Sequence, residues 1–163
     1  MVFLFLSVLI GCGATLVMDL WALLMRKMFN IPSLDYALVG RWIGHMPKGR
    51  FAHASIGLAA PMAGEKALGW VAHYAIGVVF AGVLLAVWGT GWAASPTLVP
   101  ALAVGIGSIV MPFFIMQPAF GFGVAASRAP APWTARARSL MAHTSFAVGL
   151  YAAGLGVSTG GVA

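Results

Sequence analysis

Four long apolar runs constrain the fold of this chain more than any other feature of its sequence. They cover about residues 2–28, 66–89, 97–117 and 138–158. A helix of about 20 apolar residues crosses a bilayer, so each run is long enough to span one. Of the 163 residues, 61% are hydrophobic and 7% are charged, whereas soluble domains are about a quarter charged. The sequence therefore predicts an all-α integral membrane protein, a four-transmembrane-helix bundle in one domain over residues 1–163.

The first run contains a pattern typical of a signal sequence, and the third contains two prolines. The first contains "LIGC", ending at Cys12, a pattern that resembles the cleavage site of a lipoprotein signal. No basic residue precedes it and the apolar run continues to Phe29, so we expect a retained membrane helix. The third run contains Pro100 and Pro112, which predict a kink or an early end. Cys12 is the only cysteine, which excludes an internal disulfide and a cysteine-built metal site.

Between the first two runs, residues 33–46 show the spacing of an amphipathic helix. Apolar residues recur every four positions, at Leu34, Leu38, Trp42 and Met46. Ser33 is the expected N-cap, with Asp35 in the first turn. Residues 51–64 are apolar but short, and we expect an interfacial or re-entrant helix there, ended by Pro61.

The distribution of basic residues predicts the topology. All nine lysines and arginines lie in or beside the loops after the first and third runs: Arg26, Lys27, Arg41, Lys48, Arg50 and Lys66, then Arg128, Arg136 and Arg138. The positive-inside rule assigns both loops to the cytoplasm, which gives an N-out/C-out topology with the amphipathic helix at the cytoplasmic face. The topology accounts for the net charge of +6. Nucleic-acid binding is disfavoured, because the sequence has no basic helix face.

Ionisable and polar residues from all four runs fall at a similar depth. Asp19 precedes Arg26 by seven residues and His73 follows Lys66 by seven, so each lies about 10 Å inside the membrane edge. His143 and Gln117 lie near the same level. Small residues flank His73 at Gly69 and Gly77, and Gly149 precedes Ala153 by four, spacings that favour close helix contacts. We expect Asp19 to point towards His73 or His143.

This intramembrane cluster of Asp19, His73, His143, Gln117 and Glu65 fits three kinds of chemistry. It could be a hydrogen-bonded network that only packs helices, or a path for protons or a solute, since histidine titrates near neutrality. Asp19, His73 and His143 could also bind a divalent metal or haem, with Glu65 at the mouth as a ligand or an entry point. Secondary candidates are His45, His53 and Tyr74.

One nucleotide-binding pattern is rejected. "GFGVAA", residues 121–126, matches G-x-G-x-x-A, but it follows a predicted membrane helix and no acidic residue lies about 20 positions later. Its glycines instead predict an irregular turn.

The stretches "GATLVMDLWALLMRK", "GRWIGHMPKGRFAH", "GWVAHYAIG", "MQPAFGFGVAAS" and "SLMAHTSFAVGLY" together resemble a family of small uncharacterised bacterial integral-membrane proteins. The resemblance covers nearly the whole chain. It implies a bacterial inner-membrane location and one compact domain, and it carries no established activity.

Three functions follow as expectations. The first is proton-linked or cation-linked transport of a small solute. The second is a metal- or haem-binding membrane enzyme, and the third is a structural or assembly subunit without chemistry. A four-helix unit encloses little volume, so we expect a homo-oligomer or a partner membrane subunit, with the lipid bilayer as the surrounding partner.

Overall fold

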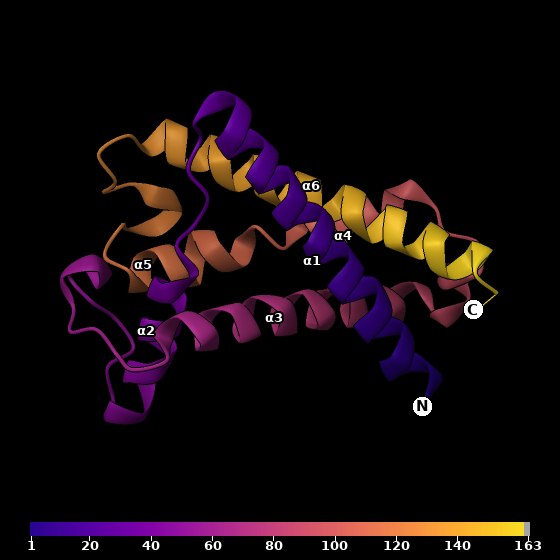
Figure 1. Cartoon of the computed structure of the whole chain (residues 1–163), viewed down its shortest axis with the longest axis horizontal. Coiled ribbons are helices and arrows are strands. Elements are labelled where there is room, and N and C mark those ends of the chain that lie inside the picture. Colours follow the sequence, from indigo (N-terminus) through magenta and orange to yellow (C-terminus); the bar gives the residue numbers. More distant parts are fainter. Residues whose placement is uncertain (162–163) are drawn as a thin grey trace. The chain divides into compact units, whose positions relative to one another are not determined.

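The computed structural model describes residues 1–161, and all regular structure in that range is helical (Figure 1). The elements in chain order are α1 (Val2–Phe29), α2 (Tyr36–His45), η1 (Met46–Lys48), η2 (Ile56–Leu58), α3 (Glu65–Trp88), η3 (Thr90–Ala93), α4 (Leu98–Gly107), η4 (Pro112–Met116), α5 (Gln117–Ala119), η5 (Val124–Ala126) and α6 (Pro132–Thr159).

Four helical segments are long and apolar enough to cross a membrane, as the sequence predicts. They are Val2–Phe29, Glu65–Trp88, Leu98–Ala119 and Pro132–Thr159. The last segment begins six residues before the predicted start at 138. Its first residue is Pro132, whose fixed φ and missing N–H suit the first turn of a helix.

The predicted interruption of the third span is confirmed. α4 ends at Gly107, and residues Pro112–Met116 form a π-helical turn before α5 begins at Gln117. Pro112 has no N–H to donate to an earlier carbonyl, so an α-helix cannot pass through this position with its hydrogen bonds intact. Pro100, in the first turn of α4, is accommodated within that helix.

The chain forms two compact units, each assembled from separate segments. The first comprises Met1–Ser33, Tyr74–Ser108 and the chain from Met141 onward, and the second comprises Leu34–His73 and Ile109–Leu140. The expectation of a single domain stays a prediction.

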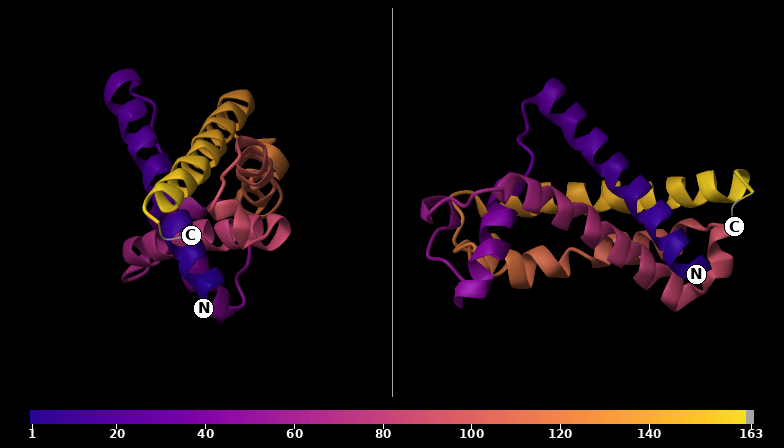
Figure 2. Two further views of the ribbon diagram at one scale, coloured as in Figure 1. Left: turned by 90° about the vertical axis from the view of Figure 1, so that its right-hand side faces the viewer. Right: turned by 60° about the horizontal axis from the view of Figure 1, so that its bottom comes forward.

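Small residues bring the helices of the first unit close together. A Cβ on Gly11 of α1 would lie 2.5 Å from the Cα of Val78 in α3, and one on Gly149 of α6 would lie 2.6 Å from the carbonyl oxygen of Ala14. Ala153 packs beside Gly13, so the predicted Gly149–Ala153 contact is present and faces α1. In both views of Figure 2, the start of α1 and the end of α6 lie at the same end of this unit.

The second unit contains the amphipathic helix, which begins later than predicted. Asp35, and not Ser33, is the N-cap of α2, with extended backbone angles of φ −80° and ψ 104°. Its carboxylate accepts a hydrogen bond of 3.0 Å from the Ala37 N–H, as the cap of a helix does.

Residues 51–64 form no helix of the length expected, which corrects the prediction of an interfacial or re-entrant helix. The only helical turn there is Ile56–Leu58. The segment instead pairs through its backbone with the end of α5. The His53 N–H donates to the carbonyl of Ala119, the last residue of α5, over 2.8 Å, and the Ile56 N–H donates to that of Phe120 over 3.1 Å. These bonds satisfy backbone groups that a helix would have satisfied internally.

Candidate functional site

Asp19 is hydrogen-bonded across two helices of the first unit. The hydroxyl of Tyr74, in α3, donates to Asp19 Oδ2 in α1 over 3.0 Å. Asp19 is half-buried and lies within a membrane-length helix. Sequence analysis placed Tyr74 only among the secondary candidates, yet it is the residue that holds the central carboxylate. The expected approach of Asp19 to His73 stays a prediction.

His143 is held by Ser108 and not by Asp19. Ser108 Oγ lies 2.6 Å from His143 Nδ1, and the same hydroxyl donates to the Gly105 carbonyl over 2.6 Å. Since a hydroxyl has one proton, Ser108 accepts from His143, and the neutral imidazole therefore carries its proton on Nδ1. The lone pair is then on Nε2, which is the atom able to accept a proton.

The Ser108–His143 pair does not have the geometry of an activated nucleophile. Ser108 is only 3% exposed, and its proton is directed at the Gly105 carbonyl and not at the imidazole. A serine nucleophile needs its base to take that proton and needs access to a substrate. The pair therefore joins α4 to α6 and orients the imidazole.

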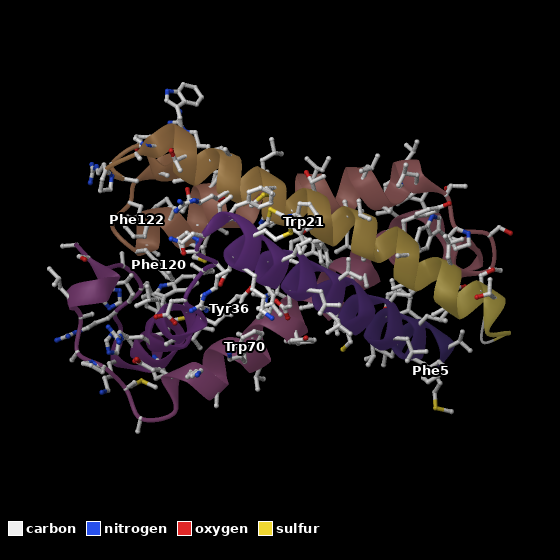
Figure 3. All side chains as sticks on the ribbon, turned by 45° about the horizontal axis from the view of Figure 1, so that its top comes forward. Phe5, Trp21, Tyr36, Trp70, Phe120 and Phe122 are labelled. Carbon is white, nitrogen blue, oxygen red and sulfur yellow. The ribbon has the colours of Figure 1, made fainter. Side chains whose placement is uncertain are left out.

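His73 belongs to an aromatic cluster in the second unit. Its ring stacks on Tyr36, with centroids 4.1 Å apart and planes 26° apart, and meets Trp70 edge-on at 5.8 Å. Tyr36 and Trp70 also contact each other, at 4.6 Å (Figure 3). Pairs of this kind contribute about 1 kcal/mol beyond the burial of their surface. Gly69 lies against the Tyr36 carbonyl and so brings α2 up to α3.

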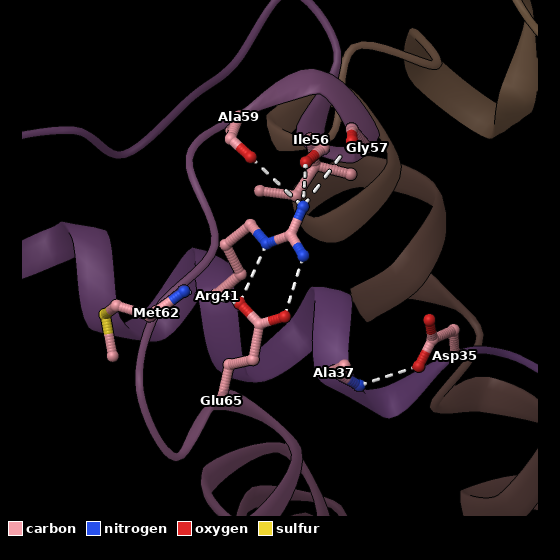
Figure 4. Close-up of polar contacts among 8 residues, drawn as sticks. All are labelled: Asp35, Ala37, Arg41, Ile56, Gly57, Ala59, Met62 and Glu65. Carbon is pink, nitrogen blue, oxygen red and sulfur yellow. Dashed lines mark hydrogen bonds and ion pairs between the residues drawn. The ribbon is translucent and has the colours of Figure 1, made fainter.

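Glu65, predicted at the mouth of the site, forms a salt bridge with Arg41 (Figure 4). Arg41 Nη2 donates to Glu65 Oε1 over 2.7 Å and Arg41 Nε donates to Oε2 over 2.9 Å. The Met62 N–H also donates to Oε2, over 2.8 Å. Arg41 Nη1 donates to the carbonyls of Ile56, Gly57 and Ala59.

This bidentate bridge fixes α2 to the start of α3. The hydrogen bonds to the Glu65 carboxylate raise the pKa of Arg41 above its ordinary value. Glu65 is thus held as a paired anion, which suits a structural clamp better than a proton entry point. Sequence analysis counted Arg41 only as a topology signal, and no local pattern marks it as the partner of a residue 24 positions away.

Gln117 is buried and bonded to α6. Its amide nitrogen donates to Ser139 Oγ over 3.2 Å. The amide oxygen is buried and has no hydrogen-bond partner among residues 1–161. A buried acceptor of this kind is a place where a water or a ligand would be bound.

His45 and His53 form a pair. His45 Nδ1 and His53 Nε2 are 2.9 Å apart, so one imidazole donates to the other. His45 is 5% exposed, and His53 Nδ1 is buried without a partner in the described part of the chain. Burial, followed by the proximity of His45, lowers the pKa of His53, and Arg50 acts in the same direction. His53 therefore favours the neutral state.

The five residues of the predicted cluster each have an identified neighbour: Asp19 bonds to Tyr74, His143 to Ser108, Gln117 to Ser139 and Glu65 to Arg41, and His73 stacks on Tyr36. Within residues 1–161, no group of three or more His, Cys, Asp or Glu side chains is arranged to hold a metal ion. Ser108 was missed, because serine is common in apolar helices and its partner is set by tertiary packing.

An all-helical chain with four membrane-length helices, joined by polar contacts between helices, is of the class expected for multi-pass membrane proteins. The chain belongs to the DUF2938 family, a family of proteins of unknown function, and the match covers residues 8–157. Neither the curated proteins nor the solved structures contain a match to it.

Proposed function

We propose that this chain is a multi-pass protein of the bacterial inner membrane that couples proton movement to the transport of a small solute. The four apolar helices support the membrane location. The nine basic residues in or beside the two connections that follow the first and third spans support an N-out/C-out topology. Placing an ionisable side chain within a membrane span costs free energy, and residues of this kind usually mark a functional site. Asp19 and His143 both lie within such spans.

One observation carries the proton-linked proposal: hydroxyl groups hold both Asp19 and His143. Tyr74 donates to Asp19, and Ser108 accepts from His143 Nδ1. A hydroxyl orients an ionisable group without fixing its charge, whereas the Arg41 guanidinium fixes the charge of Glu65. Asp19 is the proposed site of proton binding coupled to the solute, and His143, through Nε2, the group that passes a proton on. A homo-oligomer or a partner subunit completes the pathway.

The test is a proteoliposome assay with a pH-sensitive dye trapped inside the vesicles. Amino acids, sugars and divalent cations are added in turn outside, and the internal pH is followed. We expect at least one class to drive a pH change in the wild-type protein and none to do so in Asp19→Asn. Asn keeps a side-chain oxygen for Tyr74 but cannot bind and release a proton. An unchanged response in Asp19→Asn would remove Asp19 from the mechanism.

A structural subunit is the second candidate, favoured by the way each polar contact joins two helices. Tyr74–Asp19 joins α3 to α1, Ser108–His143 joins α4 to α6, and Gln117–Ser139 joins α5 to α6. In that case Asp19→Asn retains full function in cells, and Asp19→Leu loses it only to the extent that the protein is lost. Cellular abundance measured beside the phenotype separates the two candidates.

A further inference from the structure

Within residues 1–161, three arginines in the loop before α6 and at the start of α6 have no acidic partner. No aspartate or glutamate follows Glu65 in the sequence, and the remaining 98 positions contain Lys66, Arg128, Arg136 and Arg138. Among residues 1–161, Glu65 pairs with Arg41, Asp35 caps α2 and Asp19 binds Tyr74. Among the described residues the three arginines therefore present uncompensated positive charge, which favours an anion from outside the chain.

Two of these arginines are anchored to one short stretch of backbone, residues 122–126. Arg136 Nε donates to the Ala125 carbonyl over 2.8 Å, and the Arg128 N–H donates to the Phe122 carbonyl over 2.8 Å. The stem of Arg128 lies over Gly123, since a Cβ there would be 3.0 Å from Arg128 Cγ. Ala125 and Ala126 both have left-handed φ values, 47° and 57°, a conformation that costs about 1 kcal/mol for alanine. Residues 122–126 are thus held in an unusual shape between the backbone and stem of Arg128 and the guanidinium of Arg136.

Trp133 completes this arrangement from the first turn of α6. The Arg136 guanidinium lies 4.6 Å from the centre of the Trp133 ring. Trp133 is 79% exposed, so the ring is packed against Arg136 and is otherwise open. Trp side chains concentrate at the headgroup layer of membranes, where their apolar ring and polar N–H are both satisfied. Only Nε of Arg136 bonds to the described chain, which leaves its terminal N–H groups for a ligand.

We propose that Arg128, Trp133 and Arg136 form a binding site for the phosphate of an anionic phospholipid. A guanidinium presents paired N–H groups that match two phosphate oxygens. Arg128, in the loop before α6, and Arg136, in the second turn of α6, both border residues 122–126 and would bind the same phosphodiester. The Trp133 ring packs beside the glycerol backbone of the same lipid. The inference rests on the proposed membrane location but is independent of proton transport.

Arg138 provides a matched control. It is two residues beyond Arg136 and so points to a different side of α6, whereas Trp133 and Arg136, three residues apart, share a side. Arg128 and Arg138 are both exposed, and neither side chain makes a hydrogen bond within residues 1–161. Replacing either by glutamine therefore removes one charge without removing a contact of the fold.

The experiment measures lipid binding to the full chain in detergent by native mass spectrometry, comparing phosphatidylglycerol with phosphatidylcholine. We expect the wild type to prefer phosphatidylglycerol, and we expect R128Q and R136Q each to reduce that preference about fivefold. R138Q keeps the wild-type preference. Because R136Q also removes the bond to Ala125, R128Q is the variant that tests the site without disturbing the loop.

Three results would overturn the inference: no preference in the wild type, an equal loss in R128Q and R138Q, or full displacement of the lipid by glycerol phosphate in solution. The last result would make the ligand a soluble phosphate. If the wild type prefers phosphatidylglycerol but shows no proton transport, the lipid site is supported and only the transport proposal is contradicted. Recovery of the chain in water without detergent would remove both.

Discussion

Arg41 and Glu65 are joined by two parallel hydrogen bonds of 2.9 and 2.7 Å, which tie α2 to the first residue of α3. Their side chains are 11% and 15% exposed. Arg41 also holds three carbonyls of the segment 56–59, so one guanidinium organises most of the connection between α2 and α3.

Arg41→Leu is expected to lower the free energy of unfolding by about 3 kcal/mol, because it leaves the Glu65 carboxylate without its partner. The double variant Arg41→Leu/Glu65→Leu should recover part of that loss, since no unpaired charge remains. Unfolding in mixed micelles of increasing denaturing-detergent content measures both. A double variant whose loss equals the sum of the two single losses would show that the ion pair does not couple them.

Gly69→Ala is expected to lower the free energy of unfolding by about 1–3 kcal/mol, because the new Cβ would collide with the Tyr36 carbonyl oxygen and force α2 away from α3. Gly156→Ala is the control, since nothing lies within 4 Å of a Cβ at that helical position. It should be neutral or stabilising, as alanine favours a helix more than glycine does. The same micelle unfolding assay measures both, and equal losses would argue against close packing at Gly69.

Tyr74→Phe is expected to lower the free energy of unfolding by about 1 kcal/mol or less, the usual contribution of one hydrogen bond between membrane helices. Asp19→Asn should have a similarly small effect, because an amide oxygen still accepts from the Tyr74 hydroxyl. Thermal unfolding of the two purified variants checks this. A severe loss of folded Asp19→Asn would mean that the ionised carboxylate itself is a structural requirement.

Stability should fall on acidification through the His45–His53 pair. The pKa of His53 lies below its ordinary value of 6.5 in the folded chain, so the unfolded chain takes up the proton first as the pH falls. The contribution of His53 is therefore complete above about pH 6.5 and decreases below it, until the pH passes the folded pKa. The groups facing His53 are His45 and Arg50, both of which disfavour a charged imidazole.

Hydrogen exchange of the His53 amide, which bonds to Ala119, reports this effect locally. Exchange should accelerate at acidic pH relative to that expected for an unstructured amide. In His53→Gln, which cannot titrate, the acceleration should be absent at the neighbouring Ile56 amide, which bonds to Phe120. The same acceleration at Ile56 in His53→Gln would assign the pH dependence to another group.

The sequence predicted the four membrane-length helices well, because their signal is local: each is a long apolar run bounded by loops. The break at Pro112 and the irregular turn at residues 121–126, where Gly121 and Gly123 have φ values of 91° and 71°, were equally accessible. The cap of α2 was misplaced by two residues. Ser33 and Asp35 are both good caps, and their positions alone do not decide between them.

The pairing of polar side chains could not be predicted in the same way. Equal depth along four helices predicted that Asp19 points towards His73 or His143. Depth fixes only one coordinate, and the rotation of each helix decides which residues touch. Small residues set that rotation: Gly105 lies against Ala147 and orients α4 so that Ser108 reaches His143. Arg41 and Glu65 meet because Gly40 and Gly69 let their helices approach, which no pattern within either helix reveals.

Solute-driven proton flux, measured side by side in proteoliposomes of the wild type, Asp19→Asn and Tyr74→Phe at equal amounts of folded protein, tests the central claim most directly. The proposal predicts that Asp19→Asn abolishes the flux, while Tyr74→Phe, which keeps the carboxylate and loses only its hydroxyl partner, retains a measurable part of it. Equal flux in all three proteins would contradict a role for Asp19 in proton movement.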